Sequence, residues 1–279
     1  MKNFALLTNY QMNDARTIAR RVQELIAVRR GNCWLPEDRE EGYYSLDHMP
    51  ENIECAITLG GDGTFLNAAR KLQGKRIPLF GINIGNLGYL TSASLWDLPD
   101  CIDELMQDRC RSDSRMMLEG EVSHADGRRT KDTALNEIVV GRSGALRVVE
   151  FRIFIDDEPL SIYDADGVIV STATGSTGYN LSAGGPVVMP QTDVMVITPI
   201  CPHTLRSRSV VVSAESIVRV EIGRRNKTRY DEATVTYDGT TAEIVSVVDS
   251  VEITRARESV EILRRPGSGI CDFFKNNLI

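Results

Sequence analysis

The chain has few of the residues that mark several common classes of protein. Three histidines occur among 279 residues and they are not clustered at metal-ligand spacing, so we expect no protein-bound zinc site. Six cysteines are present, but no pair has the Cys-x-x-Cys spacing. Because a chain of this length can stabilise its core without disulfides, we expect free thiols in a reducing cytosol.

Long apolar runs and an excess of basic residues are also absent. No apolar run is long enough to span a bilayer, and polar and charged residues interrupt the first segment, unlike a signal peptide. The formal net charge is -7 and the pI is near 5.2, which argues against a non-specific nucleic-acid binder. We therefore expect a soluble, cytoplasmic protein with no membrane and no nucleic acid among its partners.

Three frequent catalytic signatures are missing as well. The sequence contains no Gly-x-x-x-x-Gly-Lys-Ser/Thr loop, which excludes a P-loop enzyme. It contains no His-Arg-Asp catalytic loop, which excludes a protein-kinase fold, and no Gly-x-Ser-x-Gly nucleophile elbow.

The first hundred residues alternate between short apolar strands and amphipathic helices, and this order predicts a mostly parallel sheet covered by helices. The predicted strands are Phe4–Thr8, Ile53–Leu59 and Ile77–Ile84, and the predicted helices follow Asn13–Asp14, follow Gly63 and surround Cys101–Met106. Asn13 and Asp14 are candidate helix caps.

From about Met117 the segments become short and β-branched, with turn residues between them. This pattern predicts a second, all-β domain of sandwich type. Its predicted strands are Val148–Ile155, Gly167–Ser171, Val194–Thr198, Ile217–Ile222, Ala233–Tyr237 and Ala242–Val248, with a turn at Asp156–Asp157. Gly223–Asp231 is expected to be an exposed loop, and Cys271–Ile279 a short amphipathic tail.

The segment Gly60–Thr64 (Gly-Gly-Asp-Gly-Thr) joins a predicted strand to a predicted helix. Glycines there let backbone N–H groups approach a phosphate, and the helix N-terminus favours anions. Asp62 would repel a phosphate, so its carboxylate is a candidate hydroxyl-activating base or metal contact. The alternative is that Asp62 only caps the helix.

Two further segments suit a ligand. Gly81–Leu90 follows the next strand and carries three glycines, and Tyr89 could cover an aromatic base. Taken alone, a tight loop with Tyr89 in the core explains it better. Asn136–Glu137 interrupts an apolar strand, where two buried polar side chains would suit a sugar diol; a strand end exposed to water is the alternative.

A long run rich in glycine, serine and threonine extends from Asp164 to Pro186. Its N–H and hydroxyl groups could bind a pyrophosphate or a ribose, and the alternative is a flexible linker. Tyr179 and the adjoining apolar strand argue against a linker. Asp238–Gly239 is best explained as a hairpin turn, and His203 as a structural residue.

Six motifs follow one another in an order that is highly specific. They are Gly60–Thr64, Gly81–Leu90, Asn136–Glu137, Asp166–Gly167, Thr174–Thr177 and Pro199–His203. Through these motifs the chain resembles the NAD kinases over nearly its whole length. The glycine turn alone is less specific, since it also resembles the turn of diacylglycerol and sphingosine-type lipid kinases and of phosphofructokinases.

The resemblance implies a domain organisation and a reaction. Residues 1–112 would form the α/β domain, residues 113–255 the NAD-binding β-sandwich, and residues 256–279 a tail packing back on the N-terminal domain. The enzyme would transfer the γ-phosphoryl group of ATP, or of polyphosphate, to the 2′-hydroxyl of the adenosine ribose of NAD. Mg²⁺ would be carried mainly by ATP, and the chain would form homodimers or homotetramers.

The resemblance also implies roles for residues. Asp62 would be the general base. The substrates would be held at the phosphates by Gly61 and Gly63, at a ribose by Asn136 and Glu137, at the adenine by Tyr89 and Thr177, and at the nicotinamide end by Asp166, with Tyr179 and Ser182 close by. The chain departs from the family pattern at Ala173 and Ser209, where proline is usual, and at Gly178, where alanine is usual. None of these departures removes a proposed catalytic group.

Two other functions share the glycine turn. A lipid kinase would need an apolar cleft and membrane contact, which the polar segments at Asn136–Glu137 and Thr174–Ser182 disfavour. A non-catalytic dinucleotide sensor would bind NAD without forming NADP. An assay of NADP formation, with lipid acceptors as controls, separates the three.

Overall fold

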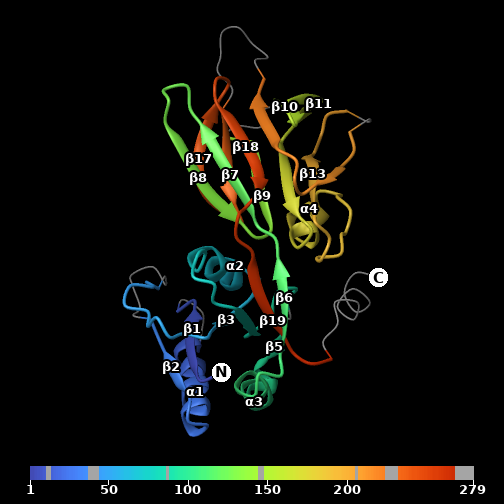
Figure 1. The fold of residues 1–279 in the computed structure, drawn as a ribbon. Helices are drawn as coiled ribbons and strands as arrows, with labels where there is room; N and C mark the ends of the chain where they lie inside the picture. Colours follow the sequence, from blue (N-terminus) through green and yellow to red (C-terminus); the bar gives the residue numbers. More distant parts are fainter. Residues whose placement is uncertain are drawn as a thin grey trace. The chain divides into compact units, whose positions relative to one another are not determined.

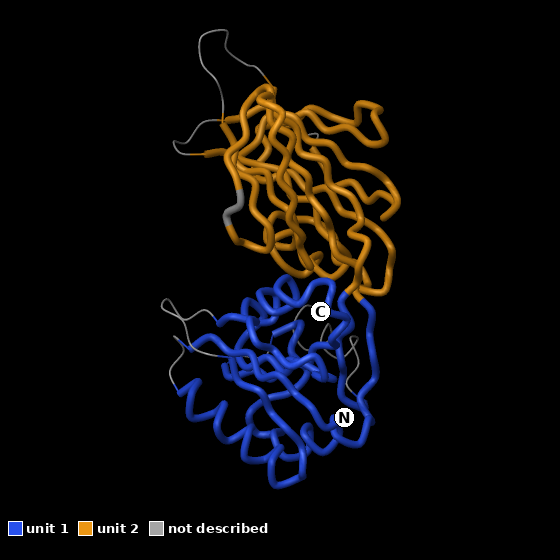
Figure 2. The backbone as a smooth tube through the Cα atoms, turned by 60° about the vertical axis from the view of Figure 1, so that its left-hand side comes forward, with its two compact units in different colours: residues 1–114, 260–279 blue, residues 115–259 orange. Residues whose placement is uncertain are grey.

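The computed structural model describes residues 1–10, 14–36, 44–85, 88–143, 148–204, 207–223 and 232–267. The chain forms two compact units (Figure 2). Unit 1 comprises Met1–Ser114 together with the segment that begins at Val260, and unit 2 comprises Arg115–Ser259. Asn86, most of Gly223–Asp231 and the tail Cys271–Ile279 lie outside the described residues.

Unit 1 is built on one sheet whose strand order is β2-β1-β3-β4-β19-β6, with β5 beside β4 (Figure 1). The strands are β1 (Asn3–Thr8), β2 (Asn32–Trp34), β3 (Cys55–Leu59), β4 (Leu79–Asn83), β5 (Ala93–Ser94), β6 (Arg111–Arg115) and β19 (Val260–Arg264). The pairs β1–β2, β1–β3, β3–β4, β4–β5 and β4–β19 are parallel. The predicted parallel sheet is confirmed, although β2 and β19 were not predicted as strands.

Helices α1 (Ala15–Val28), α2 (Asp62–Lys71) and α3 (Leu98–Met106) belong to unit 1, and a short turn of 3-10 helix, η2 (Leu95–Asp97), precedes α3. Helix α1 buries Ala15, Ala19, Val22 and Ile26, the spacing of one helical face. Asp14 occupies the N-cap position with φ 62°, but its side chain makes no capping hydrogen bond. The predicted side-chain cap is therefore wrong for Asp14, because its left-handed backbone departs from the extended conformation of a capping residue.

The order of the sheet marks one edge as a ligand site. Strand β1 has β2 on one side and β3 on the other, so the chain leaves β1 first in one direction and then in the other. Ligands of open α/β sheets bind beyond the carboxyl ends of the strands at such a switch point. The Gly60–Gly63 turn follows β3 at that edge.

Unit 2 is a sandwich of two six-stranded antiparallel sheets (Figure 1). The first, ordered β11-β10-β15-β18-β7-β8, contains β7 (Leu118–Ser123), β8 (Arg129–Ala134), β10 (Val149–Ile155), β11 (Glu158–Ala165), β15 (Val218–Ile222) and β18 (Ser250–Arg255). The second, ordered β14-β13-β12-β9-β16-β17, contains β9 (Glu137–Arg142), β12 (Gly167–Thr172), β13 (Val194–Ile200), β14 (Val210–Ser213), β16 (Glu232–Tyr237) and β17 (Thr240–Ser246). One apolar core joins the two sheets, which confirms the predicted all-β domain.

Turn chemistry in unit 2 follows the sequence closely. Asp156 and Asp157 have φ values of 52° and 68° and connect β10 to β11. Asp238 and Gly239, at φ 49° and 76°, connect β16 to β17. Consecutive left-handed residues match the twist of a two-residue hairpin, so both turns are confirmed.

Some strands of unit 2 were not predicted, and their composition explains why. Strand β8 reads Arg-Thr-Lys-Asp-Thr-Ala and β11 begins Glu-Pro-Leu-Ser. Both lie at the edge of a sheet, where charged residues and proline are compatible with pairing on one side only. Among the described helices, none is long and apolar enough to cross a membrane.

Candidate active site

The turn after β3 leaves glycine surfaces open. A Cβ on Gly60 would lie 2.3 Å from Oγ1 of Thr64, so this position requires glycine for packing. A Cβ on Gly61 or Gly63 would meet nothing within 4 Å. The first turn of α2 begins here, and the first N–H groups of a helix have no partner within it. The turn thus combines the N-terminus of a helix with two glycines at which a side chain would meet no neighbouring atom.

Asp62 does not cap the helix. It is the first residue of α2, its carboxylate makes no capping bond, and the N-cap position belongs to Gly61. The carboxylate instead accepts the backbone N–H of Tyr89 on Oδ2, at 2.8 Å, and that of Leu90 on Oδ1, at 3.1 Å. A Cβ on Gly88 would lie 2.1 Å from Oδ1, so glycine at that position lets the loop close over the carboxylate.

The loop that receives Asp62 is itself held from the other side. The guanidinium of Arg264, on β19, donates from Nη2 to the carbonyl of Tyr89 at 3.2 Å. Its Nη1 lies 3.4 Å from the carbonyls of Leu90 and Thr91. Arg264 was not predicted from the sequence, and no local pattern could have predicted it, because it lies 175 residues from Tyr89 along the chain.

Tyr89 is 8% exposed, as the alternative of a core residue predicted. The side chain of Asn83 orders the same loop, accepting the N–H of Gly85 at 2.6 Å and lying 3.4 Å from Oγ1 of Thr91. The loop is therefore a packed structure around Asp62, with Tyr89 as part of its core.

In unit 2, Asn136 lies between β8 and β9, and Glu137 is the first residue of β9. The carboxylate of Asp238, in the β16–β17 turn, accepts the N–H groups of Leu135 at 2.8 Å, Asn136 at 2.8 Å and Glu137 at 3.2 Å. Asp238 therefore does more than form the predicted hairpin, because its carboxylate fixes the backbone that presents this pair. Only the pairing of β16 with β9 brings Asp238 to this place.

Glu137 is 8% exposed, and its Oε2 has no hydrogen-bond partner, as is also true of Oδ1 of Asn136. The carboxylate accepts the N–H of Tyr179. Burial, followed by the nearby charge of Asp238, raises the pKa of Glu137 to about 7. Two buried acceptors without donors are uncommon in a folded protein and suit a ligand that supplies hydroxyl groups.

The Gly/Ser/Thr run is packed against this pair and is not a linker. It contains a turn of 3-10 helix, η3 (Gly175–Thr177), and a short helix, α4 (Tyr179–Ser182). A Cβ on Gly175 would lie 2.1 Å from the carbonyl oxygen of Asn136, and one on Gly178 would lie 3.1 Å from Oε2 of Glu137. Thr172 also donates its hydroxyl to the carbonyl of Leu135 at 2.7 Å.

The remaining predicted residues of unit 2 occupy different places. Thr177 is half-buried and donates to the carbonyl of Thr174 at 3.3 Å, while Tyr179 and Ser182 are exposed on α4. Asp166 does not lie beside the Asn136–Glu137 pair. Ser171 pairs with Glu137, so Asp166 lies five residues back along the chain, about 17 Å away in an extended strand. There it forms an ion pair with Arg142 at 2.9 Å.

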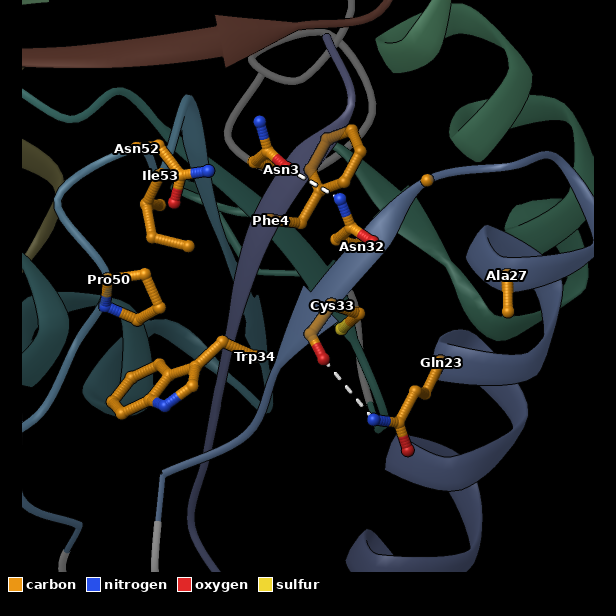
Figure 3. A pocket seen from close by; sticks show the side chains of 11 residues that line it. Asn3, Phe4, Gln23, Ala27, Asn32, Cys33, Trp34, Pro50, Asn52 and Ile53 are labelled. Atoms are coloured by element: carbon orange, nitrogen blue, oxygen red, sulfur yellow. Dashed lines mark hydrogen bonds between the residues drawn. The ribbon is translucent and has the colours of Figure 1, made fainter.

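A cavity of about 510 Å³ lies elsewhere in unit 1, beside the edge strand β2 (Figure 3). Two amides fix its walls: Gln23 donates to the carbonyl of Cys33 at 3.2 Å and Asn32 to Oδ1 of Asn3 at 2.9 Å. Its lining contains no charged side chain and none of the predicted site residues. We assign no chemistry to it.

Comparison with known proteins shows the family of the chain. Residues 2–110 match the family model of the ATP-NAD kinase N-terminal domain, and residues 135–265 match that of the ATP-NAD kinase C-terminal domain. The chain belongs to the NAD kinase family. It is therefore a phosphotransferase of the NAD kinase type, as the motifs predicted.

Individual NAD kinases are similar to this chain along most of their length. The chain is 38% identical to an NAD kinase of Lachnoclostridium phytofermentans, over 96% of this chain and 95% of the relative. It is 41% identical to one of Gemmatimonas aurantiaca, over 82% and 78%. An NAD kinase from Archaeoglobus fulgidus, solved in complex with ATP, superposes with a TM-score of 0.76 at 25% identity, covering 99% of this chain and 96% of that one. A yeast NADH kinase shares the fold, with a TM-score of 0.87 at 22% identity, covering 100% and 89%.

Proposed function

We propose that this chain transfers the γ-phosphoryl group of ATP to the 2′-hydroxyl of the adenosine ribose of NAD, with Asp62 as the general base. Membership of the NAD kinase family implies ATP-dependent phosphorylation of NAD. The observation that supports Asp62 as the general base is the position of its carboxylate, which Tyr89 and Leu90 hold beside the open faces of Gly61 and Gly63.

In the proposed reaction the 2′-oxygen attacks the γ-phosphorus of ATP. A new O–P bond forms, the bond between the γ-phosphorus and the β–γ bridging oxygen breaks, and ADP leaves. The hydroxyl proton passes to a carboxylate oxygen of Asp62, which contributes about 10²–10⁴-fold to the rate. Phosphoryl transfer needs alignment and charge neutralisation above all, so the fixed orientation of the carboxylate matters as much as its basicity.

The glycine turn suits the phosphates. Because Gly61 and Gly63 carry no side chain and meet nothing within 4 Å, a phosphate oxygen can approach their backbone. The positive end of the α2 dipole favours the same anion. We assign the phosphates to this turn and the accepting hydroxyl to Asp62.

The polar pair of unit 2 suits a ribose. Oδ1 of Asn136 and Oε2 of Glu137 are buried acceptors without partners, and a sugar diol supplies two donors. We assign the adenine to Tyr89 and Thr177, and the nicotinamide end to Asp166 with Tyr179 and Ser182 nearby. Asp166 lies about 17 Å along β12 from the ribose pair, a separation that suits an extended dinucleotide.

Mg²⁺ is assigned to the phosphates of ATP. Within the described part of the chain, no three histidine, cysteine, aspartate or glutamate side chains converge as a metal-binding group. Mg²⁺ commonly keeps several waters and binds through phosphates with few protein ligands. Polyphosphate as an alternative donor, assembly into homodimers or homotetramers and a cytoplasmic location stay predictions.

Asp62→Asn tests the base. We expect NAD binding, measured by calorimetry, to stay within a few-fold of normal, while turnover to NADP falls about 10²–10⁴-fold. The amide of asparagine would also place its NH₂ group against a backbone N–H, so the binding measurement is needed to separate lost chemistry from a displaced loop.

Glu54→Gln is the matched control for Asp62→Asn. The carboxylate of Glu54 accepts the N–H groups of Lys2 and Asn3 at 2.6 and 2.9 Å, the same kind of contact in the same unit. This variant should keep normal turnover. Near-normal turnover of Asp62→Asn would contradict the base assignment. Phosphorylation of a lipid acceptor in place of NAD would contradict the proposed substrate.

A further inference from the structure

We propose that Arg264 is a positioning residue for phosphoryl transfer, acting on Asp62 through the peptide group between Tyr89 and Leu90. This inference rests on the proposed role of Asp62. It assigns to the last described strand, β19, a part in assembling the reaction centre that goes beyond packing.

One peptide group connects the two charges. Its carbonyl belongs to Tyr89 and accepts a hydrogen bond from Nη2 of Arg264 at 3.2 Å. Its N–H belongs to Leu90 and donates to Oδ1 of Asp62 at 3.1 Å. The cation therefore lies at the carbonyl end of the group and the carboxylate at its N–H end, which is the orientation that the peptide dipole favours.

Polarisation through the peptide strengthens the contact with Asp62. A positive charge on the carbonyl oxygen draws electrons from the amide nitrogen, so the N–H becomes a stronger donor. Hydrogen bonds to a charged partner contribute more than neutral ones. Leu90 is 1% exposed, so little water competes for this peptide group.

Hydrogen bonds hold the loop from both sides at this point. The N–H of Tyr89 binds Oδ2 of Asp62 at 2.8 Å, so both carboxylate oxygens are held by consecutive residues. Nη1 of Arg264 lies 3.4 Å from the carbonyls of Leu90 and Thr91, so the guanidinium spans three consecutive carbonyls. Removing the guanidinium should loosen the loop and let the carboxylate of Asp62 turn.

Anchoring of β19 does not depend on Arg264 alone. Ile262 pairs with Leu79 of β4, and the hydroxyl of Ser92 donates to the carbonyl of Leu263 at 3.0 Å. The next residue, Arg265, binds Glu104 through Nε at 2.8 Å and Nη2 at 3.2 Å. Arg265 therefore fastens the same strand through contacts that do not include Asp62 or its loop, which makes it a matched control.

The experiment compares Arg264→Met, Arg264→Lys and Arg265→Met in the full chain, measuring NADP formation against NAD concentration. For Arg264→Met we expect kcat to fall about tenfold, the loss of one charge-assisted contact, with the KM for NAD within about threefold of normal. Arg264→Lys should recover part of kcat.

Arg265→Met should unfold at lower urea, followed by tryptophan fluorescence, yet keep the kcat and the KM for NAD of the wild-type chain. If Arg264→Met and Arg265→Met change stability and kcat alike, Arg264 is merely structural and the inference is overturned. Unchanged kcat in a folded Arg264→Met chain would overturn it equally.

A double variant separates this inference from the base assignment. If Arg264 acts through Asp62, adding Arg264→Met to Asp62→Asn should lower kcat by less than twofold, since there is no carboxylate left to position. A full tenfold loss in that background would overturn the inference while leaving the base assignment intact. Near-normal turnover of Asp62→Asn alone would instead overturn both, because Arg264 would then have no base to position.

Discussion

Glu137 illustrates how burial and a neighbouring charge act on one residue. Its carboxyl is largely removed from water, and Asp238 lies close enough to raise its pKa further, to about 7. The carboxylate of Asp238 is fixed near Glu137, because it accepts hydrogen bonds from three backbone N–H groups of the same segment. The carboxylates of Glu137 and Asp238 therefore repel each other at the place where a ribose is proposed to bind.

The raised pKa of Glu137 predicts a pH dependence of stability. Because the pKa of Glu137 is raised above its ordinary value of 4.5, the folded chain holds this proton more tightly than the unfolded chain does. The resulting stabilisation of the folded state is full below about pH 4.5 and is lost as the pH rises to about 7. The loss amounts to about 3 kcal/mol at most. Glu137→Gln should therefore become more stable relative to the wild-type chain between pH 4.5 and pH 8, measured by urea denaturation with circular dichroism.

Glu232→Gln is the control for that series. Glu232 is an exposed glutamate of the same unit, on β16, and its replacement should shift the unfolding curve equally at both pH values. A Glu137→Gln chain whose stability relative to wild type does not change with pH would show that the carboxyl is not buried as described.

At the scale of elements, a polar cluster ties the two sheets of unit 2 together. His124 follows β7 of one sheet, and Glu243 lies on β17 of the other. The imidazole Nε2 lies 2.8 Å from Glu243, and Nδ1 lies 3.5 Å from Asp249, which precedes β18. All three side chains are nearly buried, with exposures of 8%, 11% and 8%. The guanidinium of Arg128 lies 2.7 Å from Glu243 as well.

His124→Ala should destabilise unit 2 by about 1–3 kcal/mol at pH 7, because it leaves two buried carboxylates short of a partner. Burial opposes ionisation of Glu243 and Asp249, but their hydrogen bonds and His124 outweigh it and lower the pKa of each. Stability from these carboxylates is present above about pH 4.5 and is lost as the pH falls further. The difference between His124→Ala and the wild-type chain in urea should therefore shrink at low pH.

His203→Ala provides the comparison, because the side chain of His203 is exposed in the same unit. Its unfolding midpoint should stay within about 0.5 kcal/mol of the wild-type chain. Equal effects of the two substitutions at pH 7 would contradict a stabilising role for the cluster.

At the scale of the whole molecule, unit 1 is completed by residues from the far end of the sequence. The chain leaves unit 1 after Ser114 and returns at Val260. Strand β19 then lies between β4 and β6, with Ile262 0% and Leu263 4% exposed. Unit 1 therefore cannot assemble its sheet until unit 2 has been synthesised.

A chain that ends at Ser259 should lose the folded state of unit 1 and keep that of unit 2. Removing two buried aliphatic side chains costs about 3–6 kcal/mol before the lost strand pairing is counted, which is a large part of the stability of a domain. Both tryptophans, Trp34 and Trp96, belong to unit 1, so their fluorescence reports on it. We expect the fluorescence transition in urea to disappear while the circular dichroism transition of unit 2 remains.

A chain that ends at Gly267 isolates the effect of β19 from that of the residues beyond it. This chain should retain the fluorescence transition. Loss of that transition from both shortened chains would show that residues after Gly267, and not β19 alone, hold unit 1 together.

Much of the fold and part of the site could be predicted from local patterns. The alternation of strands and helices before residue 112, the short strands after Met117 and the two hairpin turns all depend on residues that are close in sequence. Asp62 stood out because a carboxylate is unusual in a glycine turn. The edge strands β8 and β11 were missed, since their charged residues and proline hide the alternation of a strand.

The sequence by itself determined the α/β and β-sandwich classes, the turns and the motifs of the NAD kinase family, because these follow from steric and hydrophobic preferences of neighbouring residues. Tertiary structure alone decided what holds the candidate site. Asp62 meets the N–H of Tyr89 across 27 positions, and Arg264 meets its carbonyl across 175. Asp238 reaches Asn136 across 102 positions. Such contacts depend on which strands lie side by side, and that is settled only when the three sheets have packed around their cores.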